Sequence, residues 1–472
     1  MARTQSAVPE RMQKSILHGP IVRTLLVLGW PIMLTNVFQM LYNLVDTYWL
    51  GKVSVEAVAA ANLAWPLVFL FVSVAAGLGV AGVALVSQHA GAGNETEARR
   101  SAGQVMSLLT ILSIVMSVLG VLGTDFILHF MGAAPDVVGQ ASPYIKVIFA
   151  GMPFMFIVMV YSFILRGWGD TRTPMYIIAF SVGLNMVLDP ILILGVDGLV
   201  PAYGILGAGI ATLISRSIGG FVALHLLFRG KRTLTISVSD LKIEKDRAKQ
   251  IFKIGIPASV GHSMVALGFV IMVAFTAGIS TEVLAAYGIG DRVIGIVFII
   301  TGGLTGAAVT MMGQCLGAQK KERASKILYR TMALTAVFLF ICSAIFYVFR
   351  AEIIGVFIDD AIVIEEGARF FALFGLSIAF FGIFATAQSA FMASGHTVPT
   401  MVLGIVRLWM LRIPFSFVLA FTLGYGASGI WIGMALSNLV SAILAVIWVS
   451  RGTWQRSVIA EPPKAKDVAE VL

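Results

Sequence analysis

The sequence contains twelve apolar stretches, each long enough to cross a lipid bilayer as an α-helix, which takes about 18 to 20 residues. Hydrophobic residues make up 58% of the 472 residues and charged residues only 12%, whereas about a quarter of a soluble domain is charged. The chain is therefore predicted to be an all-α polytopic membrane protein with twelve transmembrane helices. The predicted spans are residues 24–50, 57–87, 104–131, 142–166, 174–196, 204–229, 251–278, 283–314, 327–350, 367–393, 399–422 and 428–450.

Basic residues mark one side of the predicted membrane. They gather in the N-terminal arm and in the even-numbered connections, for example at Arg99, Arg172, Lys242 and Lys320, while the ninth connection is acidic. Because cytoplasmic loops carry an excess of Lys and Arg, both termini are predicted to be cytoplasmic in a multi-pass protein of the plasma or inner membrane. The same excess accounts for the net charge of +9, so no nucleic-acid partner is expected.

The chain also repeats itself at an offset of 226 residues. Identical residues recur without a gap, including the pairs Pro31 and Pro257, and Gln88 and Gln314. Each half has six predicted spans, an even number, so the halves enter the membrane in the same sense and are predicted to be two six-helix lobes related by a pseudo-two-fold axis along the membrane normal. Parallel repeats of this kind are typical of secondary transporters. The predicted parts are an N-terminal lobe at 1–229, a cytoplasmic inter-lobe linker at 230–250, a C-terminal lobe at 251–450 and a cytoplasmic tail at 451–472.

The first apolar stretch carries a carboxylate, Asp46, and a stripe of polar residues. Spacings of three and four residues place Asn36, Gln39, Asn43 and Asp46 on one helix face. An ionisable group at membrane depth costs about 3 kcal/mol if it faces lipid, so Asp46 is a candidate site residue in a bundle interior or a water-filled cavity. The alternative is that Asp46 snorkels to the headgroups, since it lies four residues before Leu50. The continuation of the stripe to Asn36 argues against that alternative.

A second polar face occurs in the fifth stretch, where Asn185 and Asp189 are four residues apart. At 1.5 Å per residue, Asp189 lies about 22 Å along its helix, a height similar to that of Asp46. Two carboxylates facing one cavity would repel each other and hold a proton readily. Alternatively, their oxygens and that of Asn185 would form a cage for Na+. A third interpretation is that Asp189 only makes a hydrogen bond inside the bundle.

Two prolines inside these stretches are predicted to matter for conformation. Proline lacks a backbone N–H and disturbs the preceding helical turn. Pro190 would therefore free backbone carbonyls near Met186 for a ligand or a water, and Pro31 would allow the first helix to bend.

Several motifs occur together in this chain. They are the proline and Asp46 of the first span, the Asn185 to Pro190 segment, the Arg166 to Pro174 loop, the Gly204 to Thr212 run and the duplicated Gln-x-x-Gly-Ala turns. In combination they resemble the multidrug and toxic compound extrusion (MATE) family, and the resemblance extends over essentially all twelve spans. It is closest to the branch that includes archaeal members and DinF-like proteins.

This resemblance implies a secondary active multidrug efflux transporter rather than an enzyme. Such a protein exports cationic or amphipathic organic compounds in exchange for H+ or Na+ by alternating access, uses no cofactor and contacts membrane lipids; a monomer is expected. The resemblance assigns coupling to Asp46 and Asp189, with Asn185 and Thr212 as further ligands. The seventh span has His262 and Ser263, and the tenth span has no acid where another branch does. Coupling through the C-terminal lobe is therefore not expected.

Two other functions are weighed against export. A lipid-linked oligosaccharide flippase of the same superfamily would need a cationic cleft, for which Arg216, Arg407 and Arg412 are the candidates. An intramembrane aspartyl protease would need Asp170, in the sequence Gly-Trp-Gly-Asp, to lie within a span. Asp170 instead falls in a short connection between basic residues, which argues against proteolysis.

Overall fold

The computed structural model describes residues 7–130, 135–230 and 233–459, so parts of the predicted arm, linker and tail lie outside the described residues. Among the described residues, twelve helical segments are long and apolar enough to cross a membrane, which confirms the predicted all-α fold. In the N-terminal half these segments belong to α2 (Ile21–Gly51), α3 (Val55–Gly91), α4 (Glu95–Phe130), α5 (Pro135–Trp168), α6 (Arg172–Ile193) and α7 (Ile205–Arg229).

The C-terminal half is more interrupted. It contains α8 (Lys245–Ala277), α9 (Thr281–Gly317), α10 (Lys321–Val348), α11 (Arg350–Gly355), α12 (Ala361–Leu373), α13 (Ile378–Ser394), α14 (Thr397–Ile405), α15 (Ile413–Phe417) and α16 (Gly426–Ser450). The 3₁₀ turn η2 (Gly375–Ser377) separates α12 from α13, and the π-helical segments η3 (Val406–Arg412) and η4 (Val418–Thr422) flank α15. A further short helix, α1 (Ala7–His18), precedes the bundle, and η1 (Val238–Leu241) lies in the connection between the halves.

Several helices begin well before the predicted spans. The helix α4 starts at Glu95 rather than at residue 104, and α8 starts at Lys245 rather than at residue 251. Apolarity ends where a helix leaves the membrane, but the helix itself continues through its charged first turn. Acidic residues there, such as Glu95 and Asp246, favour the helix N-terminus.

Helix ends repeat between the halves. Ser54 caps α3 by accepting a hydrogen bond from the backbone N–H of Ala57, and Ser280 caps α9 in the same way through Val283. Gly169 and Gly395, at equivalent positions after α5 and α13, have positive φ angles of 100° and 78°, which only glycine adopts readily. The sequence repeat therefore specifies where helices stop as well as how they pack.

Packing within the halves follows one scheme. In the N-terminal half, α5 contacts α3, α4 and α7, and α6 contacts α2 and α7. In the C-terminal half, α13 contacts α9, α10 and α16, and α14 contacts α8. The contacts between the halves are reciprocal, because α2 packs on α9, α3 packs on α8, and α3 and α9 touch each other. A two-fold relation between parallel repeats produces this pattern.

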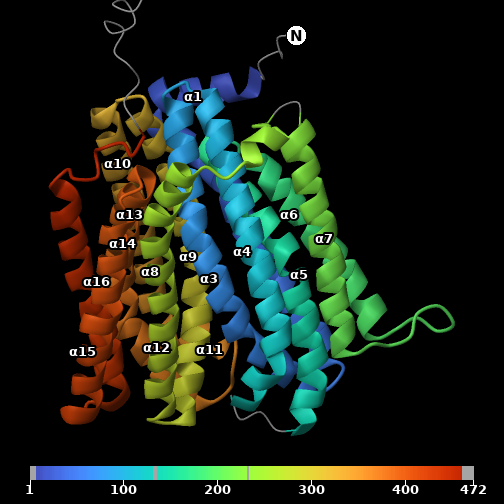
Figure 1. Cartoon of the computed structure of the whole chain (residues 1–472). Helices are drawn as coiled ribbons and strands as arrows, with labels where there is room; N and C mark the ends of the chain where they lie inside the picture. Colours follow the sequence, from blue (N-terminus) through green and yellow to red (C-terminus); the bar gives the residue numbers. More distant parts are fainter. Residues whose placement is uncertain (1–6, 131–134, 231–232, 460–472) are drawn as a thin grey trace, which may run out of the picture.

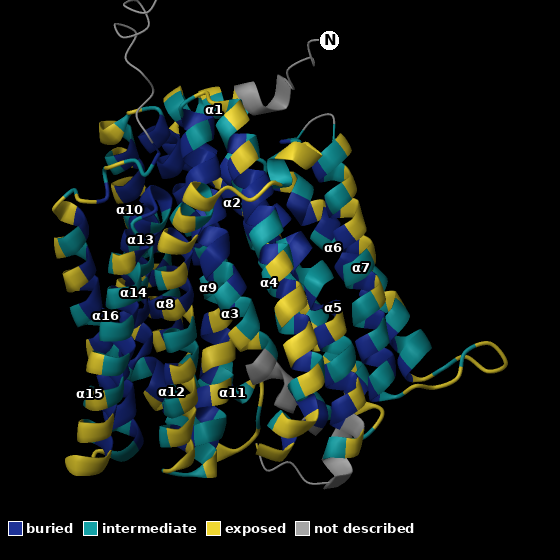
Figure 2. Cartoon of the chain, in the orientation of Figure 1, coloured by how far each residue is buried: buried dark blue, intermediate teal, exposed yellow. Residues whose placement is uncertain are grey.

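The tightest junction between the halves lies at the end of the bundle where α1 is seen, which we call the termini end (Figure 1). Buried residues concentrate in the inner helices at this end (Figure 2). Gln88 Nε2 donates to the carbonyl of Ala393 at 2.9 Å, and Gln314 Nε2 donates to the carbonyl of Gly167 at 3.1 Å. These two cross-half bonds are equivalent under the repeat, and both glutamines are fully buried.

Two glycines allow this junction to close. A Cβ atom on Gly91 would lie 1.9 Å from the Gln314 carbonyl oxygen, and one on Gly317 would lie 1.8 Å from that of Gln88. Segments after the last span add to the closure, because Gln88 Oε1 accepts hydrogen bonds from Ser457 Oγ and the Val458 N–H. The described structure is thus closed between its halves at the termini end.

We predict that Gly91→Ala destabilises the purified protein by about 1–3 kcal/mol, because the added methyl group overlaps backbone that cannot move independently. Gly183→Ala is the matched control, since a Cβ there meets nothing within 4 Å and alanine favours a helix. Thermal unfolding in detergent measures both variants. Equal stability of the two variants would show that the junction is not tightly packed.

Candidate functional site

Helices α2 and α6 pack side by side and carry the two predicted carboxylates. Asp189 and Asn185 on α6 are 0% and 1% exposed, whereas Asp46 on α2 is partly exposed. The carboxylates of Asp46 and Asp189 interact electrostatically. The fold therefore brings together acidic side chains that are 143 positions apart in the sequence.

These side chains leave oxygen atoms without partners. Asn185 Nδ2 donates to Asp189 Oδ1 at 3.1 Å. Asp46 Oδ1, Asn185 Oδ1 and Asp189 Oδ2 are buried and have no hydrogen-bond partner. An unpaired buried acceptor costs about 1–3 kcal/mol. Because all three atoms are acceptors, a hydrogen-bond donor, a proton or a cation would satisfy them.

The donor set also fits a hard monovalent cation. Carboxylate and amide oxygens are the ligands that such cations prefer. No group of three or more His, Cys, Asp or Glu side chains placed to hold a metal occurs in the described part of the chain. Binding of Na+ here would therefore use the two carboxylates and the Asn185 amide, without a third acid.

A second polar network connects α2 to α7 beside the carboxylates. The Tyr42 hydroxyl lies 2.7 Å from Thr212 Oγ1, and Arg216 Nη2 donates to Gln39 Oε1 at 3.2 Å. The Arg216 guanidinium also lies 5.0 Å from the centroid of the Tyr42 ring, a cation–π contact. Thr212 and Gln39, both predicted site residues, thus belong to a network that contains a positive charge.

The remaining residues of the predicted stripe, Asn36 and Asn43, have different surroundings. Asn36 faces α9 of the other half, since its Nδ2 is 3.6 Å from where a Cβ on Gly302 would lie. Asn43 is exposed, and its backbone carbonyl accepts a hydrogen bond from Thr47 Oγ1 at 2.8 Å. The stripe therefore begins with Asn36 at the interface between the halves and ends with Asp46 in the acidic region.

Both predicted conformational prolines lie inside continuous helices. Pro31 is buried in α2, and its carbonyl accepts a hydrogen bond from Thr35 Oγ1 at 2.8 Å. Pro190 lies in the last turn of α6, directly after Asp189. Since proline has no N–H, the carbonyls of Val27 and Met186 lose their helical donor at these points.

Sequence reasoning missed two aromatic residues of the site. Tyr42 lies near Asp46, Asp189 and Arg216, and the buried Tyr144 on α5 lies near both carboxylates. Tyr42 lies three residues after Gln39 and four before Asp46, so the helical spacing already placed it on the polar face. Tyr144 gave no comparable signal, because its position depends on how α5 packs.

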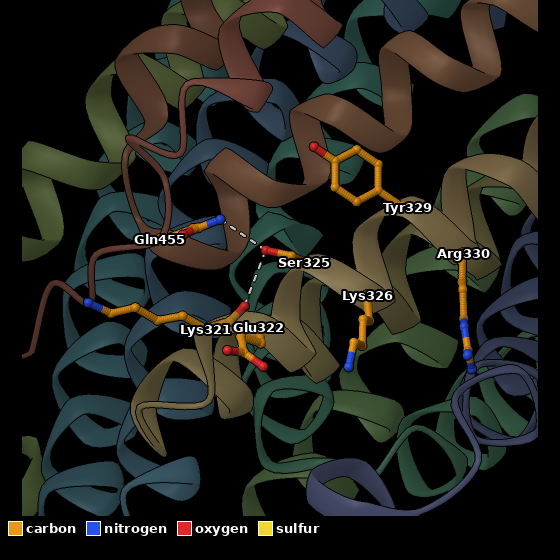
Figure 3. A pocket seen from close by; sticks show the side chains of 7 residues that line it. All are labelled: Lys321, Glu322, Ser325, Lys326, Tyr329, Arg330 and Gln455. Atoms are coloured by element: carbon orange, nitrogen blue, oxygen red, sulfur yellow. Dashed lines mark hydrogen bonds between the residues drawn. The ribbon is translucent and has the colours of Figure 1, made fainter.

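A separate pocket lies at the termini end, on the first turns of α10 (Figure 3). Gln455 Nε2 donates to Ser325 Oγ at 2.9 Å across it. The residues that line it are Lys321, Glu322, Ser325, Lys326, Tyr329, Arg330 and Gln455. The predicted site residues are not among them, so this pocket is distinct from the acidic region.

Comparisons with known proteins agree with the repeat. The family model MatE matches the chain twice, at residues 31–191 and 257–418, and the two matches begin 226 residues apart. The "Probable multidrug resistance protein YoeA" of Bacillus subtilis is 29% identical over 418 residues, which covers 88% of this chain and 90% of that protein. The "Probable multidrug resistance protein NorM" of Thermotoga maritima is 26% identical over 448 residues, covering 95% and 96%.

Solved structures share the fold. "Crystal structure of MATE in the bent conformation" aligns with a TM-score of 0.88 and covers 95% of this chain and 98% of that one, at 23% identity. The family match spans most of both halves, and the twelve-span helical fold is the same. The chain belongs to the MATE family, whose members are membrane transporters and not enzymes.

Proposed function

We propose that this protein is a secondary active multidrug efflux transporter that exports cationic or amphipathic organic compounds in exchange for H+ or Na+. Asp46 and Asp189 carry the coupling, with Asn185 as a further ligand. The observation that carries this proposal is the set of three buried, unpartnered oxygens in the N-terminal half. The names of the relatives, which describe multidrug resistance proteins, support the substrate class.

Exchange follows because the organic cation and the coupling ion compete for the same negatively charged carboxylates. While the carboxylates are ionised, they attract an organic cation, and a proton or Na+ arriving at the same oxygens neutralises them. Loss of that charge releases the cargo. A single site that holds either the cargo or the ion, but not both, couples the two fluxes in opposite directions.

We propose that the termini end faces the cytoplasm, because the basic residues of the even-numbered connections gather there. The proposed lobes are residues 1–229 and 251–450, joined by the 230–250 connection. Closure at the termini end then corresponds to an outward-facing state, in which external ions reach Asp46 and Asp189. A bend of α2 at Pro31 is the proposed link between ion occupancy and release of the cargo.

We also propose that the protein belongs to the branch of the MATE family that includes archaeal and DinF-like members. The N-terminal half holds the acids of the proposed site, whereas α8 carries Ser263, whose hydroxyl oxygen lies 2.8 Å from that of Ser73 on α3. This placement of the acids supports the branch of archaeal and DinF-like members.

Replacing Asp46 with asparagine keeps the side-chain size and removes the charge and the exchangeable proton. We expect Asp46→Asn to express and fold normally but to lower export of a cationic dye at least tenfold, because occupancy of the site no longer depends on the ion. Dye efflux from a drug-sensitised bacterial host measures this loss. Asp197→Asn, at an exposed carboxylate in the α6–α7 connection, is the control that retains full export. Undiminished export by Asp46→Asn would remove this residue from the coupling mechanism.

The identity of the coupling ion is tested in proteoliposomes under a pH gradient or a Na+ gradient, applied one at a time. The wild-type protein is expected to transport dye under at least one gradient, and Asp189→Asn under neither. Dye movement driven equally well in the absence of both gradients would contradict secondary active exchange.

Arg216 offers a test of the local electrostatics. Arg216→Gln removes the positive charge on the Tyr42 ring, and Tyr42 lies near both carboxylates, so the coupling cation should bind more tightly and half-maximal transport should need several-fold less of it. Arg216→Lys retains the charge and should stay close to the wild-type value. A weaker ion dependence in Arg216→Gln would indicate that the arginine is itself part of the ion site.

A further inference from the structure

The segment that corresponds to α6 in the C-terminal half comprises α14 and η3, and it carries two arginines at a depth similar to that of the amide and the acid of α6. Counting from the equivalent prolines, Asn185 and Asp189 follow Pro174 by 11 and 15 residues, and Arg407 and Arg412 follow Pro399 by 8 and 13. The four side chains thus lie at similar depths in two related helices. The buried charges of the two halves have opposite sign.

Arg412 has polar partners. Its Nε donates to Ser437 Oγ at 3.0 Å and its Nη2 donates to Asn438 Oδ1 at 2.7 Å, both on α16. Asp291 on α9 interacts electrostatically with it. The side chain of Arg412 is only 3% exposed, but its buried guanidinium has hydrogen-bond partners within the protein. Arg412 therefore has a structural role in this conformation.

Arg407 differs from Arg412 in this respect. It is 4% exposed, its Nε is buried without a hydrogen-bond partner, and the described residues give it no ion pair. Its guanidinium lies 5.0 Å and 5.1 Å from the ring centroids of Phe381 and Phe384 on α13, and the charge of Arg412 opposes it. Cation–π contacts compensate a buried charge only in part, so the charge of Arg407 lacks a counter-ion.

The local backbone is unusual at the same place. Residues Val406–Arg412 form a π-helical turn that includes both arginines. Such turns are rare and occur frequently at functional sites, because the wider turn changes the direction of the side chains. The backbone and the unpaired charge are independent observations that coincide at Arg407.

We propose that Arg407 is the centre of an anion-binding site in the C-terminal half, which takes a carboxylate or phosphate group of an amphipathic molecule. The guanidinium provides a planar, permanently charged donor for an oxyanion, and the partly buried ring of Phe381 contacts the apolar part of the same molecule. Together with the acids of the N-terminal half, this site extends the cargo to zwitterionic compounds, an extension that rests on the proposed transport function.

The test compares two probes that differ only in the acidic group. Rhodamine B carries a carboxylate and its ethyl ester does not, while the cationic ring system is common to both. Fluorescence anisotropy measures binding of each probe to the full-length protein in phosphatidylcholine nanodiscs, with empty nanodiscs as background. No ion gradient is present, so the result does not depend on whether the protein exchanges ions.

We expect Arg407→Gln to weaken rhodamine B binding at least tenfold and to change binding of the ester less than twofold. Arg407→Lys, which retains the charge without the planar donor, should give an intermediate affinity, and Arg330→Gln, at the pocket on α10, should match the wild type. An equal loss for both probes would assign Arg407 a purely structural role and overturn the proposal.

Two further measurements keep the test decisive. If Arg407→Gln does not fold, the wild-type comparison decides, because equal affinities of the wild-type protein for both probes would overturn the proposal. Nanodiscs containing phosphatidylglycerol then identify the source of the anion. Displacement of rhodamine B by that lipid assigns the site to a lipid phosphate, whereas undisturbed binding assigns it to a soluble organic anion; either result supports an oxyanion site.

Discussion

The structure depends on keeping two carboxylates inside a bundle that is otherwise apolar. Asp46 and Asp189 lie on neighbouring helices, and each keeps one buried oxygen without a partner. An ionised acid in such surroundings is unfavourable unless a cation, a proton or a donor reaches it. The stability of this part of the N-terminal half and the occupancy of the site are therefore linked.

The internal repeat explains why the overall fold could be predicted from the sequence. Apolar stretches located all twelve spans, and residues preserved at the 226-residue offset, such as Gln88 and Gln314, form equivalent contacts in the structure. Helix limits were less accurate, because α4 and α8 begin in charged turns that hydrophobicity does not detect.

The candidate site was only partly predictable. Helical spacing placed Asn36, Gln39, Asn43 and Asp46 on one face, but it could not reveal which neighbour each side chain would meet. Gln39 pairs with Arg216 on α7, whereas Asn36 faces α9. These contacts depend on how helices distant in the sequence pack, and a one-dimensional pattern does not contain that information.

The most direct test of the central account is whether binding of an organic cation displaces the coupling ion from the acidic pair. Tetraphenylphosphonium is titrated into the purified protein in weakly buffered solution, first without and then with Na+, while H+ and free Na+ are measured. The account predicts that the wild-type protein releases H+ or Na+ in proportion to the cation bound, and that the double variant Asp46→Asn and Asp189→Asn releases neither. Equal release by both proteins, or cation binding by the wild type without any release, would contradict it.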